Sequence, residues 1–180
     1  MGKRSDFTRI DRDFYPTPIE AVRPLFPHLT PQQRYIEPCA GDGALIDHLK
    51  MADMECIHAF DIHPNHSAVV EADALQLTDV LLEADCIITN PPWNRKLLHP
   101  MIEHFSAIRP TWLLFDSDWI HTQQSAPYMA SLQKIVSIGR IKWIPGSKMT
   151  GKDNCAWHLF DKNNTQPTEF WGRIGKILLT

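Results

Sequence analysis

The alternation of short apolar runs with helix-like stretches is the feature that most constrains the fold of this 180-residue chain. The apolar runs are typical of buried strands and cover residues 34–39, 56–61, 86–89 and 112–115. The helix-like stretches between them cover residues 44–51 and 96–108. Strands that alternate with helices in this way predict an α/β fold, with a mostly parallel sheet and helices on both faces. In such folds ligands bind beyond the carboxyl ends of the strands, where the strand order reverses.

Both ends of the chain differ from this pattern. Several prolines make the segment before residue 34 rich in turns, with room for a short helix at 19–24. Further along we expect a helix at 125–132, and then an antiparallel strand pair at 135–144 and 156–160 that closes the sheet. The length suits one compact domain, which we place at 13–180, after a flexible N-terminus at 1–12.

The composition excludes several classes of protein. With 43% hydrophobic residues the chain can bury a core, yet no run is long and apolar enough to span a membrane. The first residues contain no apolar segment of the kind that secretory signals have. The 4 cysteines are dispersed and form no CxxC pair, which suits reduced thiols in a cytoplasmic protein. The histidines lack the spacing of a closed metal site, so we expect no metal.

Charge is distributed unevenly along the chain. Residues 132–180 carry eight Lys and Arg against three Asp and Glu, whereas the preceding residues carry ten against eighteen. No acidic residue lies between Asp118 and Asp153, where five basic residues occur. A polyanion would be attracted to this stretch and repelled from the rest of the chain. The alternative interpretation is a solvated face on which basic residues gather by chance.

A glycine motif follows the first predicted strand. It reads Glu-Pro-Cys-Ala-Gly-Asp-Gly-Ala-Leu over residues 37–45, and Gly41 and Gly43 allow a sharp turn and a close approach to a ligand. Asp61 ends the next strand, at a spacing that places its carboxylate to accept hydrogen bonds from ribose hydroxyls. The third glycine of a dinucleotide fingerprint would fall at Ile46. These residues therefore favour a cofactor with ribose and adenine but no phosphate.

Asp73 is a second acid that follows this motif. Its carboxylate is placed to accept from the amino group of the cofactor adenine. The alternative role is a helix cap or a turn. The residue taken alone favours the cap.

The most specific motif is Asn90-Pro91-Pro92-Trp93, directly after the strand at 86–89. Two consecutive prolines restrict the backbone and remove two N–H donors, which leaves the neighbouring carbonyls and the Asn90 side-chain oxygen as rigid acceptors. The amino group of adenine is a poor nucleophile because its lone pair is delocalised into the ring. Acceptors at Asn90 and Pro91 would release that lone pair, and Trp93 would stack on an unpaired or flipped base. The alternative interpretation is a loop with two prolines and a core tryptophan.

Together these motifs resemble the amino-methyltransferases, specifically the DNA N6-adenine methyltransferases. Asn90–Trp93 is similar to their [D/N/S]-P-P-[Y/F/W] catalytic motif, with Trp93 where Tyr or Phe is more usual. The segment Asp13-Phe14-Tyr15-Pro16-Thr17-Pro18 is similar to their N-terminal cofactor motif, and the motif order matches the gamma arrangement.

The resemblance implies a Rossmann-like S-adenosylmethionine-dependent methyltransferase fold, with S-adenosylhomocysteine as the product of the cofactor. The catalytic residues it implies are Asn90, Pro91, Pro92 and Trp93. The implied cofactor contacts are Tyr15, Thr17, Pro18, Glu37, Pro38, Cys39, Ala40, Gly41, Gly43, Asp61, Ile62, Asp73, Ala74 and Asn90.

The C-terminal part, including Lys142-Trp143-Ile144-Pro145, resembles small members of this family encoded by phages and prophages. We find no stretch large enough for a separate target-recognition domain, and we therefore expect relaxed sequence specificity on double- or single-stranded DNA. The basic stretch is expected to contact nucleic acid itself, through phosphate contacts and the stacking of one tryptophan. These nucleic-acid-binding residues are Arg140, Lys142, Trp143, Lys148 and Lys152.

Three alternatives stay open at this point. The first alternative substrate is adenine in RNA. The second is a glutamine side chain in a protein, whose amide nitrogen is an equally poor nucleophile. A protein of a different class, a methyltransferase fold from a phage that binds nucleic acid without turnover, would also carry these motifs. Binding of the cofactor distinguishes this last class, because substitution of Asp61 would leave a pure binding module unaffected.

Overall fold

The computed structural model describes residues 15–144, 146 and 149–173. Its strands are β1 (Arg34–Glu37), β2 (Glu55–Asp61), β3 (Val70–Glu71), β4 (Cys86–Thr89), β5 (Thr111–Asp116), β6 (Leu132–Gly139), β7 (Cys155–Phe160) and β8 (Glu169–Trp171). The α-helices in this part of the chain are α1 (Ile19–Val22), α2 (Ala44–Leu49) and α3 (Arg95–Ser106). The 3₁₀ helices are η2 (Arg23–His28), η3 (Lys50–Ala52), η4 (Ala74–Gln76), η5 (Asp79–Glu83), η6 (Ser117–His121) and η7 (Gln123–Ser131).

The strands form one mixed sheet in the order β3-β2-β1-β4-β5-β7-β6-β8. The pairs from β3 to β5 are all parallel, whereas β7 runs antiparallel between β5 and β6. The expected parallel sheet with an antiparallel C-terminal pair is thus confirmed. The strand order reverses between β1 and β4, so the carboxyl ends of these two strands frame the place where such sheets bind ligands.

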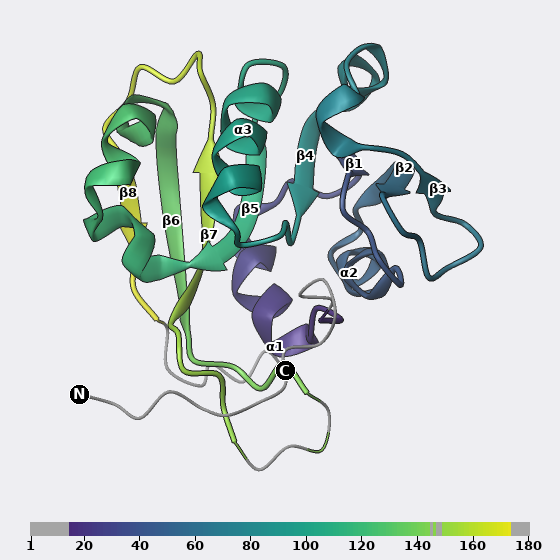
Figure 1. Ribbon diagram of the computed structural model, residues 1–180, viewed down its shortest axis with the longest axis horizontal. Coiled ribbons are helices and arrows are strands. Elements are labelled where there is room, and N and C mark those ends of the chain that lie inside the picture. Colours follow the sequence, from purple (N-terminus) through teal and green to yellow (C-terminus); the bar gives the residue numbers. More distant parts are fainter. Residues whose placement is uncertain (1–14, 145, 147–148, 174–180) are drawn as a thin grey trace.

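Helices cover both faces of the sheet (Figure 1). Successive residues of a strand point to opposite faces, so an apolar strand places side chains that need cover on both of them. On β5, Trp112 and Leu114 pack in one apolar cluster with residues of α1, η2 and α2. Leu113 and Phe115 pack on the other side, in a cluster with residues of α3. The near-continuous apolar run of β5, buried throughout except at its last residue, is what a two-faced parallel sheet requires.

Three elements in the C-terminal half of the chain differ from the expectations, and the two-residue strand β3 was not predicted either. The strand predicted at 135–144 is β6 and ends at Gly139, whose φ of +83° breaks the extended conformation. The helix predicted at 125–132 is η7, a run of 3₁₀ turns with Pro127 inside it, and a proline there removes an α-helical hydrogen bond. The edge strand β8 was not predicted, since it is short and fully exposed and so leaves no alternating apolar pattern.

In the part of the chain that the structure describes, each helix is too short or too polar to cross a bilayer.

Candidate cofactor and target site

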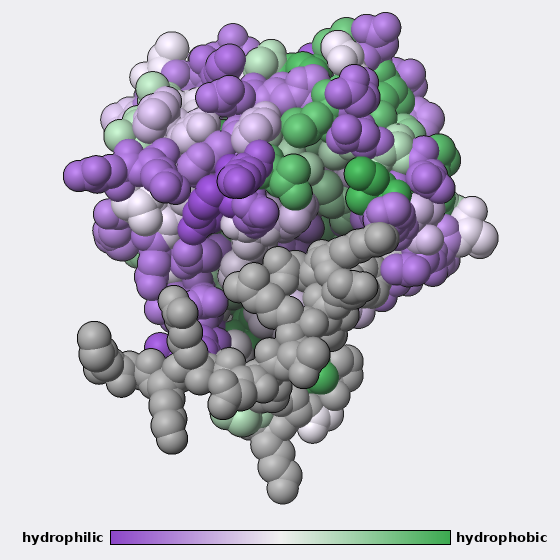
Figure 2. Space-filling view, in the orientation of Figure 1, coloured by the Kyte–Doolittle hydropathy of each residue, from purple (hydrophilic) through white to green (hydrophobic). Residues whose placement is uncertain are grey.

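A cavity of about 1130 Å³ opens at the carboxyl ends of β1 and β4. Figure 2 shows apolar side chains gathered on this face of the molecule, in the region of α3 and β4. Five segments supply most of its wall, namely residues 15–17, the glycine motif, the loop after β2, the loop after β3, and residues 90–94. Of the implied catalytic and cofactor residues, the cavity is lined by Tyr15, Thr17, Glu37, Pro38, Cys39, Ala40, Gly41, Asp61, Ile62, Asp73, Ala74, Asn90, Pro91, Pro92 and Trp93. Motifs that lie far apart in the sequence therefore share one cavity.

The glycine motif forms a tight loop between β1 and α2. Gly41 and Gly43 have φ values of +54° and +80°, which side chains with a Cβ rarely adopt. The Gly41 N–H donates to Oδ2 of Asp61 at 2.8 Å, and the His63 N–H donates to Oδ1 of the same carboxylate at 2.8 Å. Asp61 thus joins the glycine loop to the end of β2, and it also lines the cavity.

Glu37 is a buried carboxyl group in the wall of this cavity. Its side chain is 1% exposed, and Oε2 has no hydrogen-bond partner in the structure. Burial raises the pKa of Glu37 well above its ordinary value, and the neighbouring carboxylates Asp42 and Asp61 raise it further. A buried carboxyl without a partner is costly, so this position favours a ligand that brings a donor or a positive charge.

The charged residues that line the cavity also favour a positively charged ligand. Among the residues that the structure describes, one lysine, Lys152, lines the cavity. The acidic residues that line it are Glu37, Asp42, Asp61, Asp73 and Asp153. An acidic cavity of this kind attracts a cationic ligand and repels a phosphorylated one. Asp73 accepts from the Leu75 N–H at 3.0 Å and caps η4, so the cap expected as its alternative role is present.

Asn90 lies at the centre of the arrangement, just beyond the end of β4. Its Nδ2 donates to Oγ1 of the buried Thr17 at 3.1 Å, and its Oδ1 accepts from the indole N–H of Trp93 at 3.3 Å. The same indole N–H donates to the backbone carbonyl of Leu114 on β5 at 3.1 Å. The amide of Asn90 is therefore held between the N-terminal segment and the aromatic residue of its own motif.

Three aromatic rings form one wall of the cavity. Trp143 packs edge-on against Trp93 with a centroid distance of 5.6 Å and an angle of 81°, and its centroid lies 6.4 Å from that of Tyr15. The loop that carries Trp143 folds back on itself, since the Gly151 N–H donates to the Ile141 carbonyl at 2.7 Å. A Cβ at Gly151 would lie 3.2 Å from Cδ1 of Trp143, so glycine allows this close approach.

Some implied residues lie elsewhere. Pro18 and Gly43 are outside the cavity lining, and they shape the backbone at the starts of α1 and α2. Of the expected nucleic-acid contacts, Trp143 and Lys152 line the cavity, whereas Arg140 and Lys142 are exposed on the same loop outside it. Lys148 lies outside the described residues.

Sequence reasoning missed the part of the wall that α3 supplies, which consists of Leu97 and Met101. Their helical spacing of four residues is the one signal in the sequence that suggests a shared face. Burial raises the pKa of the Cys39 thiol, which favours the protonated, less reactive form. Within the described residues, no group of three or more metal-ligating side chains is gathered.

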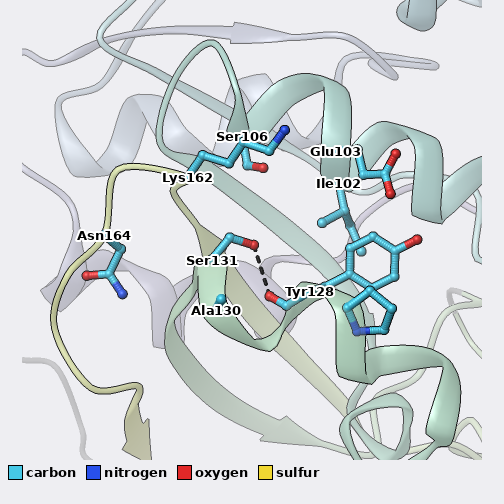
Figure 3. Close-up of a pocket in the computed structure, with 9 residues that line it drawn as sticks. Ile102, Glu103, Ser106, Tyr128, Ala130, Ser131, Lys162 and Asn164 are labelled. Atoms are coloured by element: carbon cyan, nitrogen blue, oxygen red, sulfur yellow. Dashed lines mark hydrogen bonds between the residues drawn. The ribbon is translucent and has the colours of Figure 1, made fainter.

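A second, smaller cavity of about 320 Å³ lies between α3, η7 and the residues that follow β7 (Figure 3). Tyr128 and Ser131 from η7 face Glu103 of α3 across it, and Lys162 and Asn164 follow β7. Its polar groups bond locally, as where Ser131 Oγ donates to the Tyr128 carbonyl at 2.9 Å. Because the motif residues line the larger cavity and none of them lines this one, the larger cavity is the candidate site.

Comparison with solved structures shows the fold. A candidate RNA methyltransferase from Pyrococcus horikoshii matches with a TM-score of 0.59 and 14% identity, over 84% of this chain and 88% of that one. A candidate class I S-adenosylmethionine-dependent methyltransferase from Listeria monocytogenes matches with a TM-score of 0.56 and 10% identity, over 93% and 68%. The chain has the fold of S-adenosylmethionine-dependent methyltransferases.

The M protein of the type I restriction enzyme EcoKI shares this fold, with a TM-score of 0.53 and 12% identity over 83% of this chain. The match spans 44% of the M protein, so less than half of that protein has a counterpart here. Neither a protein-family model nor a curated protein sequence matches the chain.

Proposed function

We propose that this protein transfers a methyl group from S-adenosylmethionine to the N6 amino group of adenine in DNA, with relaxed sequence specificity. The observation that carries the proposal is the placement of Asn90–Trp93 in the same cavity as the glycine loop and Asp61. The nucleophile-activating motif and the nucleoside-binding motif would then face one another, as methyl transfer between two bound molecules requires.

The residues of the cavity fit this cofactor. S-adenosylmethionine has no phosphate and a net positive charge, which suits a cavity lined mostly by carboxylates. Asp61 would accept from the ribose hydroxyls, with its carboxylate already oriented by two backbone amides. The unpaired Oε2 of Glu37 would accept from the ammonium group at the methionine end. When bound, the cofactor would supply an electrophilic methyl group and leave as S-adenosylhomocysteine, and the methylated nitrogen would release one proton to solvent.

Asn90 would act on the target amino group. Its Oδ1 and the carbonyl of Pro91 would accept the two amino hydrogens and draw the nitrogen out of conjugation with the ring. This help consists of positioning and preorganised electrostatics, because an amide is no base at neutral pH. The aromatic wall of Trp93 and Trp143 would hold the base, which must be unpaired or flipped to enter the cavity.

Nucleic acid is the substrate class that the surroundings of the cavity favour. Arg140 and Lys142 are exposed on the loop whose Trp143 reaches the cavity, so phosphates and a base would be contacted by one segment. Similar folds include a candidate RNA methyltransferase and a protein of a restriction enzyme, which supports the same class. The preference for DNA and for adenine rests on the resemblance of Asn90–Trp93 to the N6-adenine family.

The test is methyl transfer from labelled S-adenosylmethionine to a panel of substrates, with identification of the methylated product. The panel holds unmethylated DNA in double- and single-stranded form, RNA of the same sequence, and a protein with exposed glutamines. N6-methyladenine in DNA is the expected product. Methylated product found only in RNA, or only on glutamine, would show that DNA is not the substrate. Cofactor binding without any methyl transfer would indicate a non-catalytic binding protein.

A further inference from the structure

We infer that Trp93, in addition to its proposed stacking on the base, sets the orientation of the Asn90 amide through its indole N–H. The inference rests on the proposed function, because it assigns to Asn90 the role of accepting from the target amino group. Trp93 is in this respect a positioning residue, and Asn90 is the group that touches the substrate.

The two ends of an asparagine amide are chemically opposite, since the oxygen accepts hydrogen bonds and the nitrogen donates them. Thr17 is a poor selector between them, because its hydroxyl is able to donate or to accept. The indole N–H of Trp93 is a donor only, and it lies 3.3 Å from Oδ1 of Asn90. A flipped amide would bring its NH₂ group against that donor. Trp93 therefore selects the orientation that gives the target an acceptor.

The indole is itself held by the backbone of β5. The last residue of β5 that pairs with β4 is Leu113, opposite Thr89, and Leu114 is the next residue. The chain after β4 contains Pro91 and Pro92, which have no N–H to extend the ladder. The Leu114 carbonyl accepts instead from the Trp93 indole N–H, at 3.1 Å. The donor that orients Asn90 is thus fixed to the sheet and does not swing with the loop.

One acceptor position of Asn90 stays available to the target. A carbonyl oxygen has two lone pairs, and the indole N–H shares its proton between Oδ1 at 3.3 Å and the shorter bond to Leu114. A phenylalanine ring at this position would stack on a base equally well but would carry no donor. Tyrosine carries its hydroxyl at the far end of the ring. The choice of tryptophan in this motif is what makes the amide orientation unambiguous.

The test is a double-mutant cycle between Trp93→Phe and Asn90→Asp. An aspartate has two equivalent oxygens, and the motif family accepts it at this position, so the orientation of the side chain no longer matters. With Asn90 present, Trp93→Phe is expected to lower kcat about tenfold while the Kd for S-adenosylmethionine stays unchanged. In the Asn90→Asp background the same change is expected to lower kcat less than about threefold. Equal effects in the two backgrounds would overturn the inference, because stacking contributes to both alike.

Thr17 provides a second comparison within the same set of bonds. Thr17→Val has the same shape and removes the oxygen that accepts from Nδ2 of Asn90, whereas Thr17→Ser keeps that oxygen. With saturating cofactor, we expect kcat to fall several-fold for valine and to recover with serine. Equal rates in the two variants would contradict the proposed arrangement.

A measurement on the protein without substrate separates this inference from the proposed function. Hydrogen exchange of the Trp93 indole proton, followed by nuclear magnetic resonance, is expected to be slower than that of the exposed Trp171. In Trp93→Phe the Asn90 side-chain amide is expected to show two environments where the native protein shows one. A native protein that transfers no methyl group would refute the proposed function alone, whereas rapid exchange at Trp93 would refute the inference whatever the substrate.

Discussion

Gly41 donates its backbone N–H to the carboxylate of Asp61 across 2.8 Å, although the two residues lie 20 positions apart. The bond joins the loop after β1 to the end of β2, and the His63 N–H completes it by donating to the other oxygen at 2.8 Å. The side chain proposed to hold the ribose is thus also the side chain that fixes the glycine loop. With the proposed role of Asp61, loop geometry and cofactor affinity would be coupled through one carboxylate.

Asp61→Asn is expected to weaken binding of S-adenosylmethionine about 10- to 100-fold, because the amide loses the charge and one of the two backbone bonds. Isothermal titration calorimetry measures the change. Asp47→Asn is the matched control, since Asp47 lies on α2, bonds to Lys50 at 2.8 Å and is outside the cavity lining. Equal affinities for the Asp61 variant and the control would refute the role given to Asp61.

Glu37→Gln is expected to stabilise the free protein increasingly as the pH rises above about 4.5. Burial raises the pKa of Glu37, so the unfolded chain loses this proton first while the folded protein retains it. The native protein therefore loses stability as the pH rises from the ordinary pKa to the raised one, and the glutamine variant does not. Thermal unfolding of both proteins over a series of pH values measures the difference.

Glu71→Gln, at an exposed acid of β3, serves as the control for Glu37. Saturation with S-adenosylmethionine is expected to narrow the advantage of the Glu37 variant, because the ammonium group pairs with the native carboxylate. A difference in stability that does not vary with pH would contradict the account of Glu37.

His158 predicts a pH dependence of the opposite sign. The residue is fully buried, stacks on Phe115 at 3.9 Å, and neither ring nitrogen has a partner. Burial lowers the pKa of His158 from 6.5 to about 3. The unfolded chain therefore gains a proton first as the pH falls below 6.5, and the native protein loses stability until the pH reaches about 3.

His158→Phe removes this titration. Its free energy of unfolding relative to the native protein is expected to rise by about 1.4 kcal/mol for each pH unit below 6.5. Urea unfolding at several pH values measures this, with His121→Gln at an exposed position as the control. Parallel pH profiles for the native protein and the His158 variant would show that the buried ring is not the cause.

Trp143→Ala is expected to raise KM for DNA about tenfold and to leave cofactor affinity unchanged, because it removes one ring of the aromatic wall that would hold the base. Trp171→Ala is the matched control. Trp171 is 44% exposed on β8 and packs against His28 at 4.8 Å. A KM that rises equally in both variants would place the nucleic acid elsewhere on the surface.

The strands and the main motifs were predictable because their residues carry local information. The run at 86–89 coincides with β4, since a buried central strand is continuously apolar and two prolines end it. Placement of the cavity at the carboxyl ends of β1 and β4 follows from the alternation of strands and helices, which determines the direction of each strand.

Other parts of the structure depend on contacts that spacing does not encode. The bond from Asn90 to Thr17 joins residues 73 positions apart, and the bond from Trp93 to Leu114 depends on where β4 ends relative to β5. The sequence suggested that Trp93 would present its face to a base, yet it contained no signal for where the indole N–H would donate. The edge strand β8 pairs with β6 alone, and its sequence likewise contains no pattern that predicts a strand.

The most direct test of the central claim compares the native protein with Asn90→Ala in the formation of N6-methyladenine in DNA, at equal occupancy by S-adenosylmethionine. The native protein is expected to form the product. At this equal occupancy the variant is expected to lose activity by about a hundredfold or more, because the acceptor for the target amino group is gone. Full activity of Asn90→Ala would contradict the mechanism proposed for this cavity.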